Sequence, residues 1–398
     1  MSFPDVIIIG DFPFPYGSAG ANILRGHCVA LQAAGYTVGI LPKSLELGGT
    51  EILETTFRGA HVWRIPQVQP RWKLRRVIQE NLKWNDARIQ WLKQTDLRHV
   101  KAIIAYTGVG AASAFFYHLN SLCKRRGLRL FCFVVEWQAW RHFSGKQACL
   151  NVLDSEFLRR VALRWGDGTI TISAFLQDYY TRAGLKSICL PPLLDFTDPI
   201  WQGDSNSLHV ARHRPLKLLF SGSFRRERHD VILRAVLKMR QEGADMIMEY
   251  LGATRDQIER EPGVGPQLVQ ALGAGVCFHG PVDDPGSVAR ITRSASFGVL
   301  LRDNLRWAQA CFPSKVPEFF AMGIPLVANT SSDLMDYLCD EENALVCRAV
   351  TVESFYATLQ RAWKLTETQF KAMKLAALKS AQRFDARNYA KAYQQLIG

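Results

Sequence analysis

Two short segments in the second half of the chain carry residues that suit a phosphate-containing ligand. The first, 221–230 (SGSFRRERHD), lies between an expected strand and an expected helix. Its glycine, Gly222, lets the backbone approach a ligand closely, and the amino end of a helix offers free N–H groups and a positive dipole. A diphosphate site and a solvated basic turn explain this segment equally well. The cationic donors in it are Arg225, Arg226, Arg228 and His229.

The second segment, 312–323 (FPSKVPEFFAMG), predicts a short helix that Ser314 can cap and Gly323 can end. Lys315 and Glu318 are three residues apart and therefore share a helical face. A cation at a helix amino end opposes the dipole, so an anionic ligand would explain Lys315. The Glu318 carboxylate suits a pair of ribose hydroxyls. The alternative is an intrahelical Lys–Glu pair worth a few tenths of a kcal/mol.

The apolar pattern predicts the elements that position these segments. Short apolar runs alternate with helical stretches, and the alternation restarts after a polar, broken stretch in the middle of the chain. We therefore expect an α/β protein with two Rossmann-like, doubly wound parallel sheets. The expected strands are 5–10, 37–41, 101–106, 128–135, 168–172, 187–190, 216–221, 246–251, 276–279, 297–301 and 325–329. The expected helices are 21–34, 111–125, 174–184 capped by Ser173, 230–240, 352–365, 368–383 and 386–397.

Length and composition agree with two domains. A chain of 398 residues exceeds one ordinary core. We expect a first domain over 1–192, a linker over 193–214, a second domain over 215–383, and a terminal helix over 384–398 that crosses back to the first domain. The nine cysteines show no zinc spacing, and no apolar run is long enough to span a bilayer. We therefore expect a cytoplasmic protein, and the net charge of +13 indicates an acidic partner.

The two segments also carry a resemblance to a known family. The pattern P-S-K-x-x-E-x-x-A-x-G-x-P, preceded by the glycine and basic residue of 221–230, resembles the donor half of the retaining GT-B glycosyltransferases of family 4. The amino-terminal FPFPYGSAGAN segment is similar to the first β-loop-α-β unit of that family. The resemblance implies two domains facing each other across a cleft, with the acceptor in the first and the nucleotide-sugar donor mainly in the second.

The resemblance implies roles for particular residues. Gly17 and Ser18 would border the donor diphosphate from the first domain. Arg228 matches the basic residue that holds the donor phosphates, and Lys315 would face the same phosphates or the sugar. Glu318 matches the acid expected near the ribose. The other donor-binding candidates are Gly222, Ser223, Arg225, Arg302 and Ser314.

One family residue is missing. Ala310 stands where the first acid of the family's E-x7-E signature, expected near the transferred sugar, would be. Asp303 or Arg302 in the preceding loop is a candidate substitute. In the first domain, Glu136 follows an expected strand and therefore points to the ligand-binding edge of the sheet. The resemblance places a catalytic or sugar-contacting residue near Glu136, with His142 as an alternative, whereas a plain ion pair explains Glu136 about as well.

Two further patterns bear on whether the protein uses a metal and whether it contacts a membrane. No Asp-x-Asp triplet occurs, so we expect no metal and no cofactor, and cations and helix dipoles would stabilise the diphosphate leaving group. The segment 71–88 (RWKLRRVIQENLKWNDAR) interleaves basic residues with tryptophan, which suits an anionic membrane surface or a nucleic acid. The resemblance favours the membrane, with peripheral contact on its inner face and no nucleic acid. A solvated helix face is the alternative.

The function that these observations predict is a metal-independent hexosyltransferase-type glycosyltransferase (EC 2.4). It would move a sugar from a nucleoside-diphosphate donor to an acceptor hydroxyl, on a glycan or lipid-linked glycan, with retention, as in polysaccharide biosynthesis. Glu136, Arg228 and Lys315 are the catalytic candidates. The alternatives are a nucleotide-sugar epimerase on the same fold and a degenerate, non-catalytic sugar-nucleotide-binding protein.

Overall fold

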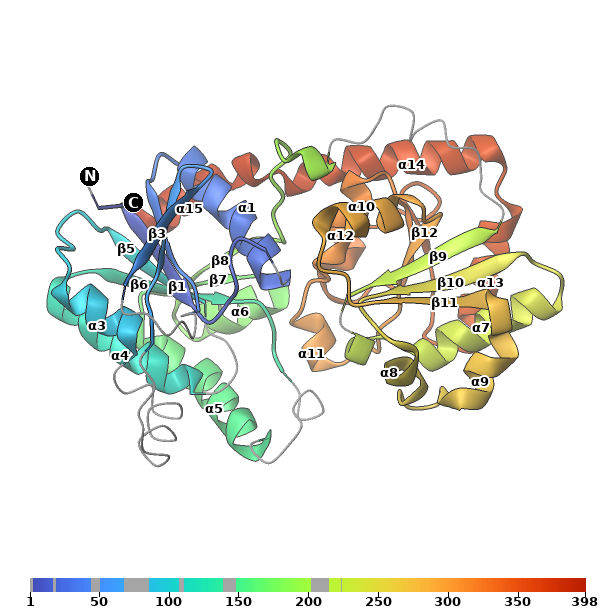
Figure 1. Cartoon of the computed structure of the whole chain (residues 1–398), viewed down its shortest axis with the longest axis horizontal. Coiled ribbons are helices and arrows are strands. Elements are labelled where there is room, and N and C mark those ends of the chain that lie inside the picture. Colours follow the sequence, from blue (N-terminus) through green and yellow to red (C-terminus); the bar gives the residue numbers. More distant parts are fainter. Residues whose placement is uncertain are drawn as a thin grey trace. The chain divides into compact units, whose positions relative to one another are not determined.

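The computed structural model describes residues 3–16, 19–43, 51–67, 86–106, 111–138, 148–201, 215–222 and 224–398. The chain forms two compact units, Met1–Leu193 with Ala386–Gly398, and Leu194–Asp385 (Figure 1). Gly17, Ser18, His142 and Ser223 lie outside the described residues, as do positions 71–85 of the basic segment and 202–214 of the linker.

The first unit is built on an eight-stranded sheet in the order β3-β4-β2-β1-β5-β6-β7-β8. All neighbouring strands pair in parallel except β3 and β4, which form an antiparallel hairpin. The strand order reverses between β1 and β5, and ligands bind at such a switch point, beyond the carboxyl ends of the strands. The strands are β1 (Val6–Gly10), β2 (Val38–Leu41), β3 (Leu53–Phe57), β4 (Ala60–Arg64), β5 (Ala102–Tyr106), β6 (Arg129–Val134), β7 (Gly168–Thr171) and β8 (Lys186–Cys189).

Six α-helices of the described residues flank this sheet. The predicted cap of the helix that begins at Ala174 is confirmed, because the Ser173 side chain accepts a hydrogen bond from the Leu176 N–H. The carboxyl-terminal helix packs on the first helix of the chain, where Leu396 and Ile397 are buried. The helices are α1 (Ala19–Ala33), α3 (Ala87–Gln94), α4 (Ala112–Arg126), α5 (Ala148–Arg160), α6 (Ala174–Arg182) and α15 (Ala390–Ile397).

A buried histidine makes the stability of this unit depend on pH. His27 on α1 is 2% exposed, and its Nδ1 lies 2.7 Å from the hydroxyl of Tyr393 on α15. Burial lowers the pKa of His27 from 6.5 to about 3. The unfolded chain therefore takes up a proton below pH 6.5 that the folded chain does not. The stability that neutral His27 contributes is present above pH 6.5 and is lost as the pH falls towards 3.

We expect the wild-type protein to lose about 2 kcal/mol more unfolding free energy between pH 7 and pH 5 than a His27→Gln variant does. Urea unfolding followed by tryptophan fluorescence measures this difference. His99 is exposed in the same unit, so His99→Gln is the matched control and should keep the wild-type slope. Equal slopes for wild type and His27→Gln would show that the buried ring does not resist protonation.

Arg88 is buried, which corrects one residue of the predicted basic surface. It is 2% exposed, and its Nη2 lies 2.8 Å from Asp11 Oδ1 and 2.7 Å from Asp86 Oδ2. Its Nη1 donates to the Gly10 carbonyl at 2.7 Å. The guanidinium therefore holds the chain that leaves β1 and does not belong to a membrane-facing surface. The pattern of basic residues and tryptophans did not predict the burial of Arg88. Its partners Gly10 and Asp11 are distant in sequence, and Asp86 does not stand out from the polar residues around it.

The second unit is built on a six-stranded parallel sheet in the order β11-β10-β9-β12-β13-β14. Its switch point lies between β9 and β12. The loops after β9 and β12, and the segment before β13, contain all the donor-binding candidates of this half of the chain. The strands are β9 (Leu216–Ser221), β10 (Met246–Leu251), β11 (Val276–Gly280), β12 (Phe297–Leu300), β13 (Leu326–Ala328) and β14 (Ala344–Val346).

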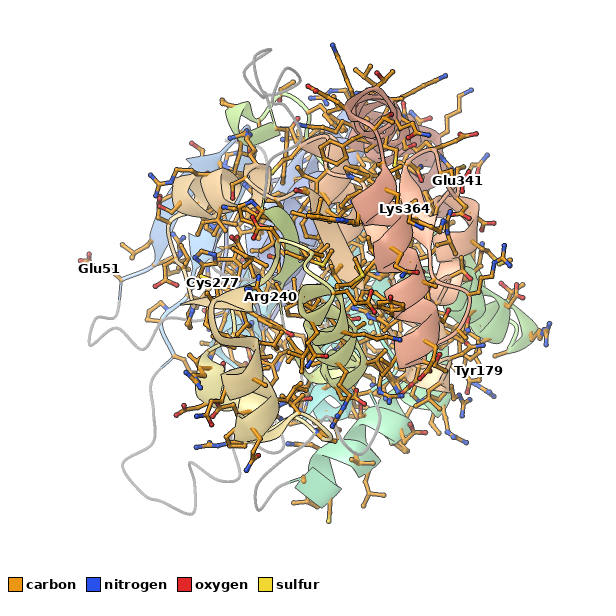
Figure 2. All side chains as sticks on the ribbon, turned by 90° about the vertical axis from the view of Figure 1, so that its right-hand side faces the viewer. Glu51, Tyr179, Arg240, Cys277, Glu341 and Lys364 are labelled. Carbon is orange, nitrogen blue, oxygen red and sulfur yellow. The ribbon has the colours of Figure 1, made fainter. Side chains whose placement is uncertain are left out.

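The helices of the second unit bury apolar side chains. Arg240 at the end of the first of them donates to the Met246 carbonyl at 2.7 Å, and Gly275 has no side chain that would occupy this space (Figure 2). Among the described residues of the whole chain, no helix is both long and apolar enough to cross a membrane. The helices are α7 (His229–Gln241), α8 (Arg255–Glu259), α9 (Gly265–Leu272), α10 (Pro285–Arg293), α11 (Arg306–Gln309), α12 (Lys315–Ala321), α13 (Val352–Lys364) and α14 (Glu367–Ala381).

Candidate functional site

The loop after β9 is fastened to the end of β12 by one buried acid. The Glu227 side chain is 1% exposed, accepts the Leu301 N–H at 2.9 Å and accepts Arg302 Nε at 2.6 Å. The Arg228 N–H also donates to the Leu301 carbonyl at 2.8 Å. At the start of the loop, Gly222 has a φ of +126°, a conformation that residues with a Cβ rarely adopt. The loop that carries the predicted cations therefore has a defined conformation beyond the carboxyl ends of the strands.

Arg302 is the best enclosed of the predicted donor-binding cations. Its side chain is 9% exposed, and Nη1 is buried with no hydrogen-bond partner among the described residues. Asn329, after β13, accepts the Arg302 N–H at 2.9 Å and donates to the Arg302 carbonyl at 2.8 Å. The loops after β9, β12 and β13 are thereby joined at one edge of the sheet. A donor group of Arg302 remains available for a ligand oxygen there.

Arg228 is held between two carboxylates. Its Nε and Nη2 each donate to Asp230 at 2.9 Å, and its Nη1 donates to Asp303 at 2.9 Å. The two acids raise the pKa of Arg228 further above its usual value. They fix the orientation of the guanidinium but also offset its charge. Asp303, a candidate substitute for the missing family acid, is thus a partner of Arg228.

His229 is not a cation, which corrects the interpretation of this loop as a cluster of four cationic donors. The ring is 1% exposed and lies 2.7 Å from the Phe224 carbonyl and 3.2 Å from the Tyr250 hydroxyl. A carbonyl only accepts, so Nε2 carries the proton and Nδ1 accepts from Tyr250. Burial lowers the pKa of His229, and the neutral ring supports the loop. Arg225 is exposed next to it.

Lys315 and Glu318 form the intrahelical pair, with Nζ 2.7 Å from Oε2. The Lys315 side chain is 21% exposed and the Glu318 side chain is 9% exposed. The ammonium group is therefore partly accessible to solvent, whereas the carboxylate that it contacts is nearly buried. The expected cap is wrong in detail, because Ser314 is in the αR conformation and its side chain makes no capping hydrogen bond. The expected helix end is confirmed, since Gly323 has a φ of +68° and the Ile324 N–H reaches back to the Phe319 carbonyl.

The position of the missing family acid is closed to solvent. Ala310 is 0% exposed and ends helix α11. The Gln309 carbonyl next to it accepts the Ser332 hydroxyl at 3.0 Å, so this short helix is tied to the chain after β13. A small apolar side chain fits this buried position. Any contact with a transferred sugar must come from other residues of these loops.

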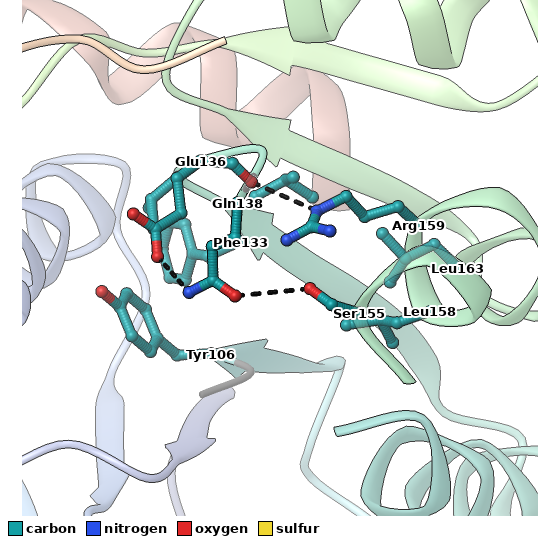
Figure 3. A pocket seen from close by; sticks show the side chains of 10 residues that line it. Tyr106, Phe133, Glu136, Gln138, Ser155, Leu158, Arg159 and Leu163 are labelled. Atoms are coloured by element: carbon teal, nitrogen blue, oxygen red, sulfur yellow. Dashed lines mark hydrogen bonds between the residues drawn. The ribbon is translucent and has the colours of Figure 1, made fainter. Parts of the chain in front are cut away.

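A cavity of about 200 Å³ lies beyond the carboxyl ends of β5 and β6 in the first unit (Figure 3). Glu136, which follows the end of β6, lines it. The Glu136 carboxylate accepts the Gln138 amide at 2.6 Å, and the Glu136 carbonyl accepts Arg159 Nε at 3.3 Å. The lining residues are Tyr106, Phe133, Val134, Val135, Glu136, Gln138, Ser155, Leu158, Arg159 and Leu163.

The described residues contain no group of three His, Cys, Asp or Glu side chains arranged to hold a metal ion. The charged groups at the carboxyl ends of β9 and β12 are instead arginines, a lysine and their acidic partners. Such an arrangement can bind oxyanions through charge-assisted hydrogen bonds. Sequence reasoning missed Glu227, Asn329 and Arg159, which matter for these sites. Nothing in the local sequence marked any of the three, and helix α5, which carries Arg159, was not predicted.

Comparison with known proteins identifies the fold of the chain and gives a family match within the second unit. Solved structures match over nearly the full length, which shows the GT-B fold of glycosyltransferases. They include sucrose-phosphate synthase from Thermosynechococcus elongatus (TM-score 0.72, 15% identity, 98% of each chain covered). The catalytic domain of starch synthase IV from Arabidopsis thaliana, bound to ADP and acarbose, matches with a TM-score of 0.69 at 13% identity over 100% of this chain and 99% of that chain. HepE from Anabaena, in complex with UDP, matches with a TM-score of 0.61 at 12% identity over 98% of each chain.

Residues 215–364 match the family described as Glycosyl transferases group 1. A search of curated proteins finds no match. Within the second unit the chain therefore carries a glycosyl transferases group 1 domain. The prediction of a glycosyltransferase with two Rossmann-like domains is confirmed. Family 4, retention of configuration and the individual site residues remain predictions.

Proposed function

We propose that the protein transfers a sugar from a nucleoside-diphosphate sugar to an acceptor hydroxyl, with the donor held by the second unit. The observation that carries this proposal is the joined edge of that unit's sheet. There Arg302, whose buried Nη1 has no hydrogen-bond partner among the described residues, lies in the same loop network as Arg228. The group 1 match over 215–364 covers these residues. Two of the similar structures bind ADP or UDP, which agrees with a nucleoside diphosphate.

The proposed donor site assigns a function to each charged residue. Lys315 would exchange the Glu318 carboxylate for a donor phosphate, and Glu318 would accept the ribose hydroxyls. Arg228 retains two N–H groups beyond those donated to Asp230 and Asp303, and these would meet the same diphosphate. Gly222 and Ser314 would allow backbone contacts, and Arg225 would add an exposed charge.

The leaving diphosphate would be stabilised without a metal or a cofactor. Preorganised cations at the place where charge develops are an effective way to lower a transition-state barrier. The acceptor would bind in the first unit, where Glu136 lines a cavity at the ligand-binding edge of the sheet. Retention and the part of Glu136 in it rest on the resemblance to family 4.

The proposal is tested by incubating the protein with UDP-, ADP- and GDP-linked hexoses, with and without a mixed glycan acceptor. Acceptor-dependent release of the nucleoside diphosphate is the expected result. Conversion of the donor sugar to its epimer without acceptor would favour the epimerase instead. Tight binding without any turnover would identify a degenerate sugar-nucleotide-binding protein, a possibility that the alanine at position 310 raises.

A peripheral contact with an anionic membrane is part of the proposal. Four large apolar side chains are exposed by 41–66% along and just after α5, an unusual density for a single helix. The exposed Arg160 and Arg164 accompany them, and the whole chain carries a net charge of +13. Apolar side chains flanked by cations suit the interface of an anionic bilayer. The four residues are Leu150, Leu153, Phe157 and Val161.

We expect a Leu153→Gln/Phe157→Gln variant to bind vesicles of phosphatidylglycerol and phosphatidylcholine at least about 10-fold more weakly than wild type, since burying two such side chains is worth several kcal/mol. Co-sedimentation measures the binding. Leu375→Gln on α14, where Leu375 is 48% exposed, is the matched control and should bind normally. Equal binding to pure phosphatidylcholine, or no loss in the double variant, would contradict the membrane contact.

A further inference from the structure

The cavity of the first unit contains a buried guanidinium group with an unsatisfied donor. Arg159, on the inner face of α5, is 5% exposed. Its Nε donates to the Glu136 carbonyl at 3.3 Å, but its Nη1 has no hydrogen-bond partner among the described residues. In Figure 3 the end of the guanidinium lies between Gln138 and Leu163, within the ring of lining side chains.

The acids around Arg159 are engaged elsewhere. Glu156 Oε1 is 3.8 Å from Arg159 Nη1, too far for a hydrogen bond, because Glu156 bonds to Trp137 Nε1 at 2.8 Å and to Arg160 Nε at 2.7 Å. Asp154 accepts the Ala112 and Ser113 N–H groups at the start of α4. The Glu136 carboxylate accepts the Gln138 amide. Within the described part of the chain, no carboxylate therefore makes the charge-assisted hydrogen bond that Nη1 is able to donate.

Such a guanidinium is costly to bury. A buried charge without a full set of partners costs several kcal/mol, and burial lowers the pKa of Arg159. The walls beside it are largely apolar, with Phe133, Leu158 and Leu163. Charge interactions are stronger in such surroundings than in water. An oxyanion that enters the cavity would satisfy Nη1 and recover this cost.

We propose that the cavity at the ends of β5 and β6 binds an anionic group, a phosphate or a carboxylate, of the acceptor substrate, with Arg159 as its ligand. This assignment rests on the proposed function, in which the acceptor binds to the first unit. Gln138 and Ser155 add polar groups to one wall, and Tyr106 and Phe133 supply aromatic surface for the rest of the molecule. The acceptor is therefore an acidic sugar or a sugar phosphate, not a neutral glycan end.

The test measures affinities of the full-length protein for glucose 6-phosphate, glucuronate, inorganic phosphate and glucose by calorimetry. We expect glucose 6-phosphate or glucuronate to bind to wild type, and glucose to bind at least about 10-fold more weakly, since a hydrogen bond to a charged group is worth about 1.5–3 kcal/mol. Whichever of glucose 6-phosphate and glucuronate binds more tightly shows whether the cavity prefers a phosphate or a carboxylate. Binding of inorganic phosphate as tight as that of glucose 6-phosphate would overturn the acceptor assignment.

Variants locate the site. Arg159→Gln should weaken the charged sugar about 10–100-fold, whereas the matched Arg182→Gln, an exposed arginine on α6 of the same unit, should leave its affinity unchanged. Ser155→Leu fills the cavity without removing Arg159 and should abolish binding of the charged sugar. This second variant tests the site even if Arg159→Gln does not fold. Charged and neutral sugars binding alike, or binding that survives in both cavity variants, would overturn the proposal.

The donor side provides a separate readout. A nucleoside diphosphate should bind Arg159→Gln as tightly as wild type, because its predicted ligands are in the second unit. If wild type binds no nucleoside diphosphate, the proposed transferase function is contradicted. If wild type binds a nucleoside diphosphate but no charged sugar, only the acceptor assignment is contradicted.

Discussion

Replacing Lys315 by alanine is expected to lower kcat/KM for sugar transfer by about 10²–10³-fold, the usual effect of removing one donor that stabilises developing negative charge. The structure explains why the ammonium group can serve a ligand. Its Nζ is 2.7 Å from the Glu318 carboxylate, is partly open to solvent, and follows a Ser314 that does not cap the helix. Steady-state kinetics with the identified donor measure the effect.

The alternative for Lys315 is a purely structural pair with Glu318. A pair of this kind at i, i+3 is worth about 0.2–0.5 kcal/mol, so its loss would leave kcat/KM unchanged. Lys371→Ala on α14 removes an exposed lysine from the same unit and is the matched control. Wild-type kinetics in Lys315→Ala would place the residue outside the donor site.

Glu227→Ala is expected to lower the free energy of unfolding by about 3–5 kcal/mol, because it leaves Arg302 as an uncompensated buried charge. The acid is 1% exposed and has two partners, Arg302 Nε at 2.6 Å and the Leu301 N–H at 2.9 Å. Urea unfolding measures the loss. Glu353→Ala, an exposed acid in the first turn of α13, should cost less than about 1 kcal/mol.

A double variant separates the structural and the ligand-binding parts of Arg302. Glu227→Leu/Arg302→Met removes both charges, and replacing a buried ion pair with apolar residues is often nearly neutral for stability. We expect it to recover much of the lost stability, with the Leu301 N–H still unsatisfied. Activity should stay low, since Arg302 Nη1 is proposed to bind the donor. Full activity in a stable double variant would show that Arg302 serves only the loop.

Most of the strands were predictable from the sequence, whereas helices α3, α5, α8, α9, α10 and α11 were not predicted. Apolar runs such as those of β1, β5, β9 and β10 are buried on both faces of parallel sheets and stand out from the polar helices between them. The β3–β4 hairpin was missed, because Leu53–Phe57 is mostly exposed and contains polar and charged residues. Helix α5 was missed because its apolar side chains point both to the cavity and to solvent.

The site was only partly predictable. The second-unit candidates Lys315, Glu318 and Arg302 were found, because a glycine, cations and an acid at recognisable spacing indicate chemistry. Their partners were not found, since Glu227 meets Arg302 only through the pairing of β9 with β12. His229 looked like a cation because nothing in the local sequence reveals that Tyr250 and Phe224 enclose it.

The central claim is that residues of the second unit bind a diphosphate, and calorimetric titration with UDP, ADP and GDP tests it most directly. We predict that at least one of them binds wild type and binds Lys315→Ala at least about 10-fold more weakly, as expected for the loss of a hydrogen bond to a charged group. No measurable binding of any of the three, or equal affinity for both proteins, would contradict the account.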